Sequence, residues 1–169
     1  MKNLSAGLKL AAIAFAVVLA GCETKPPPAQ PTTPPPVVSA PAPSIVPGSA
    51  EDLRVNVGDT VHFDSNKYAI LDADKATLQR QAAWLGKYPA VRVTIEGNCD
   101  ERGTREYNLA LGARRANAVK EFLVSQGVSS ARVDTISYGK EKPVCVESNE
   151  ACYSQNRRAV SVITKGAGA

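Results

Sequence analysis

The sequence predicts a small α/β domain, with helices packed on one face of a mixed four-stranded sheet in the order β-α-β-α-β-β. Three observations predict this class. Apolar and polar residues alternate over 91–96, a long helical pattern covers 104–126, and two more strand patterns follow. Residues 51–169 suffice for one domain with one core, and a disordered proline-rich tether is expected before it.

The first strand is expected at 61–63, followed by the loop-type residues Asp64, Ser65 and Asn66. The first helix is expected to start at Asp72 and to end before Pro89, since its apolar residues recur on one face. Those residues are Leu78, Ala82 and Leu85.

The second strand places Val91, Val93 and Ile95 on one face, as a half-buried strand requires. The long helix then ends at Gly127. Its apolar residues recur at helical spacing: Leu109, Ala113, Ala116, Val119 and Leu123. Strands at 133–138 and 159–164 complete the predicted sheet.

The N-terminal segment, residues 1–21, has the pattern of a secretory signal peptide. Its apolar run, 10–20, is too short to span a bilayer and ends in small residues before Cys22. The sequence Leu-Ala-Gly-Cys at 19–22 resembles a bacterial lipobox, so Cys22 is expected to be acylated. Glu23 then indicates delivery to the outer membrane. The alternative is an ordinary signal peptide with a coincidental cysteine.

Residues 22–50 are assigned to the lipidated cysteine and a linker. Ten prolines in this segment predict an extended tether, because proline removes backbone donors and fixes φ. At ~3.1 Å per residue such a tether reaches roughly 90 Å. A proline-rich ligand for a recognition domain is the alternative.

Charge argues against a nucleic-acid surface. The whole chain carries a formal net charge of +4, with 20 basic and 16 acidic residues, and two of the lysines lie in the signal peptide. The mature chain is therefore near neutral, and its arginines are not interleaved with stacking aromatic residues.

The strand–helix corner at 97–116 is the strongest functional signal. It places Asp100 in a loop and Arg114 and Arg115 in the following helix. An acid and a base at one corner suit a ligand that has both an amine and a carboxylate. Helical spacing puts Arg115 on the face of Leu111, with Arg114 about 100° away. The amides of the first helical turn favour an anion nearby.

This stretch closely resembles the peptidoglycan-binding motif of the OmpA-like C-terminal domain family, and the resemblance covers residues 51–165. Five blocks match in order: Asp-Glu-Arg-Gly-Thr from 100, Tyr-Asn-Leu-Ala-Leu-Gly from 107, Arg-Arg-Ala-Asn-Ala-Val from 114, Ser-Tyr-Gly-Lys-Glu-Lys-Pro from 137 and Asn-Arg-Arg-Ala-Val from 156. The chain departs from the family at Asn98, where histidine is usual.

The resemblance implies recognition of meso-diaminopimelate in peptidoglycan stem peptides. Asp100 would pair with the ligand's ammonium, and Arg115 would bind its carboxylate bidentately. The remaining pocket residues implied by the family are Phe63, Asp64, Asn108 and Leu111. A direct role for the Asn-Arg-Arg run at 156–158 stays open. The alternative for Asp100 and Arg115 is a plain salt bridge.

The family also implies partners and a location. It implies an outer-membrane lipoprotein whose domain faces the periplasm, binds the cell wall and works with TolB and other Tol proteins in envelope integrity and cell division. Another OmpA-like wall anchor, in a motor or secretion assembly, is the alternative. A peptidoglycan-modifying enzyme is a further one, but no paired acid and base, zinc set or activated nucleophile supports it. No cofactor or metal is expected.

The other cysteines and the single histidine are interpreted structurally. Cys145 and Cys152 are seven residues apart, and a disulfide between them would close a short surface loop in an oxidising compartment. Cys99 would remain a half-buried thiol. A zinc site from three cysteines and His62 is an alternative that no Cys-x-x-Cys pair supports.

Overall fold

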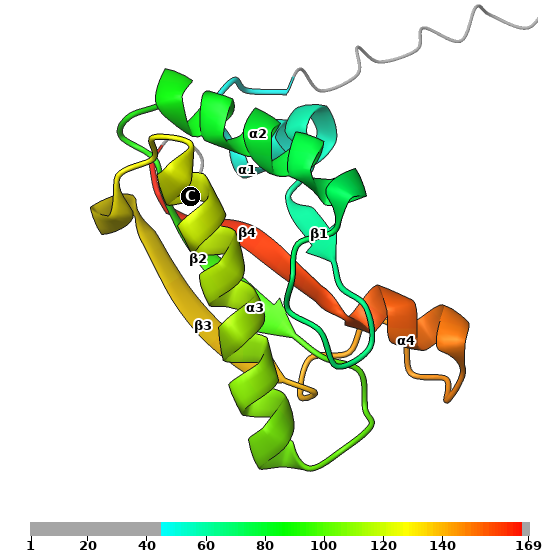
Figure 1. Ribbon diagram of the computed structural model, residues 1–169. Coiled ribbons are helices and arrows are strands. Elements are labelled where there is room, and N and C mark those ends of the chain that lie inside the picture. Colours follow the sequence, from blue (N-terminus) through cyan, green and yellow to red (C-terminus); the bar gives the residue numbers. More distant parts are fainter. Residues whose placement is uncertain (1–44, 167–169) are drawn as a thin grey trace, which may run out of the picture. The chain divides into compact units, whose positions relative to one another are not determined.

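The computed structural model describes residues 45–166 and confirms the predicted fold class: helices on a mixed four-stranded sheet (Figure 1). The signal peptide, Cys22 and most of the linker lie outside the described residues. The elements are α1 (Ala50–Asp52), the π-helical turn η1 (Leu53–Val57), β1 (Thr60–His62), α2 (Asp72–Lys87), β2 (Arg92–Asn98), α3 (Arg105–Ser125), the 3-10 turn η2 (Ser130–Arg132), β3 (Val133–Gly139), α4 (Glu150–Asn156) and β4 (Arg158–Lys165). Within residues 45–166, no helix is long and apolar enough to cross a membrane.

The strands follow the spatial order β1-β4-β2-β3. Strands β2 and β3 are parallel and are connected through α3, whereas β4 runs antiparallel to both β1 and β2. Because β4 runs against both β1 and β2, the loops after β1 and β2 and the segment before β4 meet at one end of the domain. Helices α2 and α3 cover the same face of the sheet (Figure 1).

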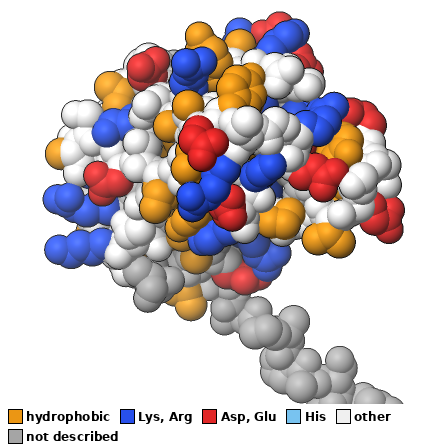
Figure 2. Space-filling model, turned by 90° about the horizontal axis from the view of Figure 1, so that it is seen from below, with side chains coloured by type: hydrophobic (Ala, Val, Ile, Leu, Met, Phe, Trp, Pro, Cys, Tyr) orange, Lys and Arg blue, Asp and Glu red, His pale blue; other side chains and the backbone are white. Residues whose placement is uncertain are grey.

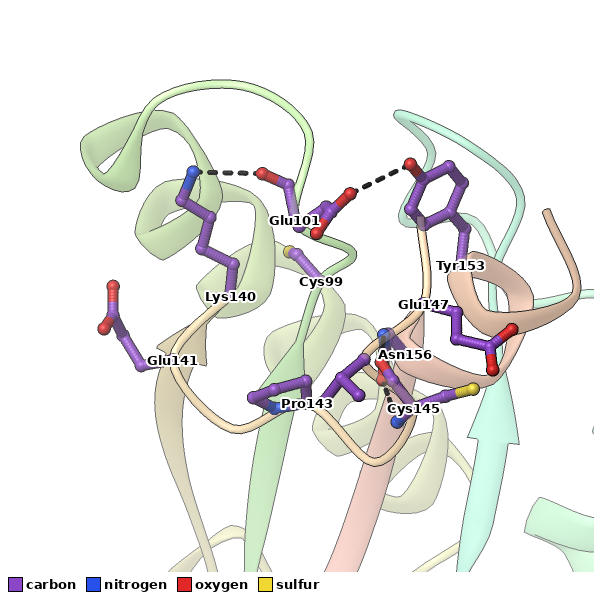
Figure 3. Close-up of a pocket in the computed structure, with 10 residues that line it drawn as sticks. Cys99, Glu101, Lys140, Glu141, Pro143, Cys145, Glu147, Tyr153 and Asn156 are labelled. Atoms are coloured by element: carbon purple, nitrogen blue, oxygen red, sulfur yellow. Dashed lines mark hydrogen bonds between the residues drawn. The ribbon is translucent and has the colours of Figure 1, made fainter. Parts of the chain in front are cut away.

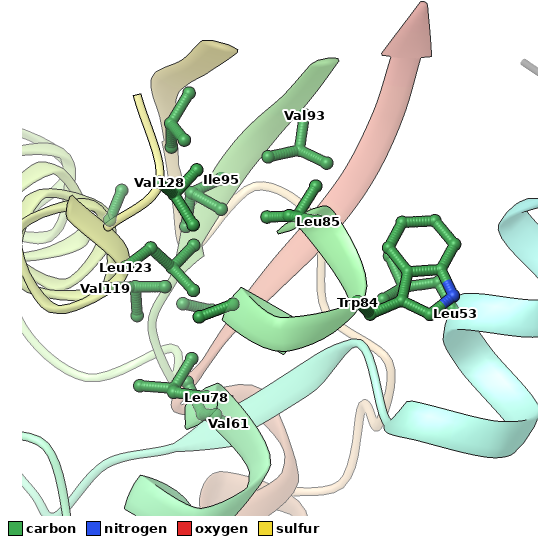
Figure 4. Close-up of a cluster of buried hydrophobic side chains, with 14 of the residues drawn as sticks. Leu53, Val61, Leu78, Trp84, Leu85, Val93, Ile95, Val119, Leu123 and Val128 are labelled. Carbon is green, nitrogen blue, oxygen red and sulfur yellow. The ribbon is translucent and has the colours of Figure 1, made fainter. Parts of the chain in front are cut away.

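The core lies between these two helices and the sheet (Figure 4). Leu78 and Leu85 of α2 and Leu123 of α3 are buried against Val93 and Ile95 of β2. The sequence periodicity predicts these buried residues of α2 and β2 and, in α3, Ala116, Val119 and Leu123. The other two residues predicted for that face of α3, Leu109 and Ala113, are only half-buried. Burial of each large apolar side chain is worth about 1.5–3 kcal/mol, so this core fixes α3 relative to β2.

Two glycines let α3 approach β2 closely. A Cβ added to Gly97 would overlap the carbonyl oxygen of Gly112, and one added to Gly112 would overlap the hydroxyl of Ser137. Only glycine fits at both positions. The contact places the next residues of α3, including Arg115, beside the carboxyl end of β2.

The structure adds two parts that the sequence did not predict. The seven-residue helix α4 lies where a surface loop was expected, and α1 and η1 precede the first strand. Gly48 and Ser49, which the sequence assigns to the linker, are buried. The Asp52 carboxylate accepts hydrogen bonds from the Gly48 amide at 2.8 Å and from Trp84 Nε1 at 2.9 Å, so the folded region begins before residue 51.

Candidate functional site

The candidate site lies at the end of the domain where three loops and α4 converge. Figure 2 views the domain from this side, and basic and acidic side chains are interspersed near the centre of the face. A cavity of about 290 Å³ opens here, lined by Ser65, Asn66, Arg102, Gly103 and Tyr107.

Asp100 lies in the loop after β2, and its carboxylate is almost enclosed, with 9% of the side chain exposed. Arg102 donates to both carboxylate oxygens, from Nε to Oδ1 at 3.1 Å and from Nη2 to Oδ2 at 2.6 Å. Arg157 donates to Oδ2 at 3.3 Å. The carboxylate is therefore held between two guanidinium groups.

Opposing effects act on the pKa of Asp100. Burial raises it, but hydrogen bonds from the Arg102 side chain and amide, the charge of Arg102 and the hydrogen bond from Arg157 outweigh burial and leave it below its usual value. The same ion pair raises the pKa of Arg102. Asp100 is consequently a carboxylate throughout the neutral pH range.

Arg115 is fully enclosed. Its guanidinium donates to the carbonyl oxygens of Lys67 at 2.9 Å, Asn98 at 2.8 Å and Asp64 at 3.1 Å, and it lies over the Phe63 ring at 5.2 Å. Burial lowers the pKa of this group below its usual value. Arg115 thus ties the loop after β1 to the end of β2, and no ion pair joins it to Asp100 among the described residues.

The other predicted residues divide into buried and exposed groups. Phe63 and Leu111 are buried, whereas the Asp64 side chain is 51% exposed and pairs with Lys67 at 3.0 Å. Asn108 is buried, and its Nδ2 donates to the carbonyls of Arg102 at 2.7 Å and Thr104 at 3.0 Å. Asn108 therefore shapes the loop that carries Asp100.

Asn98, at the position where the family usually has histidine, is incompletely hydrogen-bonded. Asn98 Nδ2 donates to the Glu96 carbonyl at 3.1 Å, while Oδ1 is the one buried side-chain polar atom of residues 45–166 that has no hydrogen-bond partner. An asparagine therefore fills only part of the hydrogen-bonding role that a histidine ring could take there.

Three of the cysteines lie in or beside the loops of the site, and they differ in state. A disulfide joins Cys145 to Cys152, the pair that the sequence favours. Cys99 is a free thiol, fully buried rather than half-buried, and its Sγ contacts the Asn108 carbonyl at 3.4 Å. Burial raises the pKa of this thiol, which favours the protonated form over the thiolate.

Sequence reasoning assigned no role to Arg102 and left Arg157 open, yet both contact Asp100 directly. Arg102 is 45% exposed and lines the cavity, so it is the guanidinium that solvent reaches at this site. Spacing in the sequence could have indicated Arg102, two residues after Asp100. It could not indicate Arg157, which comes from the far end of α4.

Comparisons with known proteins agree on one family. Residues 62–157 match the OmpA family. The chain is 51% identical over 168 residues to the peptidoglycan-associated lipoprotein of Agrobacterium fabrum, covering 99% of this chain and 93% of that protein. The corresponding identity with the Rhizobium meliloti protein of the same name is 49%, with the same coverage.

Two solved structures resemble this domain. The crystal structure of the peptidoglycan-associated lipoprotein from Burkholderia pseudomallei is 47% identical, with a TM-score of 0.61 over 62% of this chain and 89% of that chain. The C-terminal domain of Helicobacter pylori MotB, 23% identical with a TM-score of 0.60 over 64% of this chain and 86% of that one, shares the fold.

Proposed function

Because the chain belongs to the OmpA family, we propose that it binds peptidoglycan non-covalently through meso-diaminopimelate and links the outer membrane to the cell wall. The names of relatives about half identical to it support peptidoglycan as the ligand. The single observation that carries the ligand class is the ionised, almost enclosed Asp100 beside solvent-accessible Arg102.

A zwitterionic centre fits these charges. In the unliganded protein, Arg102 neutralises Asp100. The ligand's ammonium takes a place on the Asp100 carboxylate, and its carboxylate is bound by guanidinium groups. For Arg115 to contact that carboxylate, the exposed segment 64–67 has to shift, because this segment and β2 enclose the guanidinium. Three of its five N–H groups already donate to carbonyls, so a ligand carboxylate has to use the remaining ones.

The membrane attachment and the partners belong to the same proposal. Acylation of Cys22 anchors the chain in the outer membrane, and the proline-rich segment spans the distance to the wall. TolB and other Tol proteins are the proposed partners. Co-purification of Tol proteins with the full chain supports this assignment, whereas co-purification of a motor or secretion assembly favours the alternative suggested by the fold shared with MotB.

The ligand assignment is tested by sedimentation with purified peptidoglycan. Asp100→Ala and Arg115→Ala are expected to remain in the supernatant, and Arg114→Ala, whose side chain is exposed, serves as the matched control. Sedimentation of both site variants at wild-type levels shows that the assigned pocket is wrong. Muropeptides recovered intact after long incubation agree with a binding role, and cleaved ones point to an enzyme.

A further inference from the structure

Helix α4 lies against the Asp100 site. We propose that Tyr153 and Glu150 of α4 are positioning residues for binding of the ligand's amino-acid centre, and that the Cys145–Cys152 disulfide holds them in place. This inference rests on the proposed function and deepens it, since it identifies what sets the strength of binding at the site.

The disulfide and the Asn156 side chain attach α4 to the preceding loop at two positions one turn apart. Cys152 is joined covalently to Cys145. Asn156, four residues later on the same helix face, accepts from the amides of Val144 at 2.8 Å and Cys145 at 3.2 Å and donates to the Cys145 carbonyl at 2.6 Å. Both fastenings therefore converge on Cys145.

This helix has little buried surface of its own. It has seven residues, of which only Cys152 and Asn156 are buried, and helices this short are marginal in isolation. Asn149 caps its first turn by accepting from the Cys152 amide at 2.9 Å. Without the disulfide, α4 keeps its cap, the Asn156 contacts and the polar contacts of Tyr153 and Glu150, so its position relative to the site is held less firmly.

Other side chains of α4 reach the residues around Asp100. The Tyr153 ring packs against the Arg102 guanidinium at 4.4 Å, and its hydroxyl donates to Glu101 at 2.9 Å. Figure 3 shows Tyr153 directed at Glu101. Both residues line a cavity of about 350 Å³, together with Cys99 and Cys145. Glu150 accepts from Arg157 at 2.6 Å. Both arginines that hold Asp100 are thus held in turn by α4.

This arrangement preorganises the charges that the ligand meets. With Tyr153 and Glu150 in place, Arg102, Arg157 and Asp100 keep one geometry. If α4 loosens, binding has to order these side chains again, and that ordering weakens the affinity. Loss of the disulfide is therefore expected to weaken binding although no residue of the pocket has changed.

The test is calorimetric titration of the full chain in detergent with a stem peptide that contains meso-diaminopimelate, before and after reduction. The oxidised protein is expected to bind about fivefold more tightly than the reduced one. Cys145→Ser/Cys152→Ser should match the reduced protein and not respond to the reductant. Equal or tighter binding by the reduced protein overturns the inference.

A second pair of variants leaves the disulfide intact. Tyr153→Phe keeps the ring against Arg102 and should bind within about twofold of wild type, while Tyr153→Ala should bind about fivefold more weakly. Equal affinities of the two variants overturn the positioning role. If the oxidised wild type itself binds no stem peptide, the proposed function fails. If it binds and neither perturbation matters, only this inference fails.

Discussion

The two walls of the candidate site are built in different ways. On one side, Arg115 is buried in α3 and bonded to three backbone carbonyls, and α3 is fixed to β2 by the Gly97–Gly112 contact. On the other side, α4 is a short exposed helix held by a disulfide and by polar side chains. The first wall is part of the core, whereas the second is attached to it. Loss of Arg115 should cost more folding stability than any change in α4, and changes in α4 should also weaken ligand binding.

The largest effect is expected for Arg115→Ala, because it removes a fully buried side chain and three carbonyl oxygens lose their donor at once. The free energy of unfolding should fall by about 3 kcal/mol or more, as measured by urea denaturation. The neighbouring Arg114→Ala should change it by no more than about 0.5 kcal/mol. If both variants lose similarly little free energy of unfolding, Arg115 does not act as part of the core, and the first wall is no more integral to the fold than the second.

Cys145→Ser/Cys152→Ser should have a smaller effect on stability than Arg115→Ala. Closing so short a loop is worth about 2 kcal/mol in the chain-entropy description. Thermal unfolding followed by circular dichroism measures the change. A loss larger than that of Arg115→Ala would place α4 within the cooperative core and contradict the comparison.

Next comes Thr104→Ala, which removes the N-cap of α3 at the first wall. Thr104 Oγ1 accepts from the Tyr107 amide at 3.2 Å. The expected loss is about 1 kcal/mol in denaturant unfolding. The matching variant at the second wall is Asn149→Ala, which uncaps α4 and should reduce stem-peptide affinity with less effect on global stability. If both variants lose the same free energy of unfolding, the two walls do not differ in their coupling to the core.

The smallest effect is a pH dependence carried by Asp100. Its pKa in the folded protein lies below the ordinary value of 3.8, so its contribution to stability is fully present above that value and is lost as the pH falls through the folded pKa. The stability difference between wild type and Asp100→Asn should therefore be constant near neutral pH and shrink below about pH 4. A difference that grows on acidification would show that burial, not the arginines, controls this carboxyl group.

The first wall was predictable from the sequence and the second was not. Long-range periodicity places Leu111 and Arg115 on one face of α3, and the strand–helix corner follows from the alternation over 91–96. No periodic pattern marks α4, since it buries only a cysteine and an asparagine. Arg102 contacts Asp100 from two residues away in the sequence, so this contact could be anticipated from spacing. Arg157 contacts Asp100 from 57 residues away, and only the tertiary structure reveals that contact.

The contacts of Asp52 have a mechanical consequence. Residues 45–57 join the domain near α2, at the opposite end from α4 and the Asp100 loop (Figure 1). Any tension that arrives along the chain from residue 44 while a ligand is held at Asp100 has to cross the whole domain. The Gly48–Asp52–Trp84 contacts bear that load first, before the strands are loaded along their length. Pulling force would therefore peel off the N-terminal turns while the sheet and the ligand site remain folded.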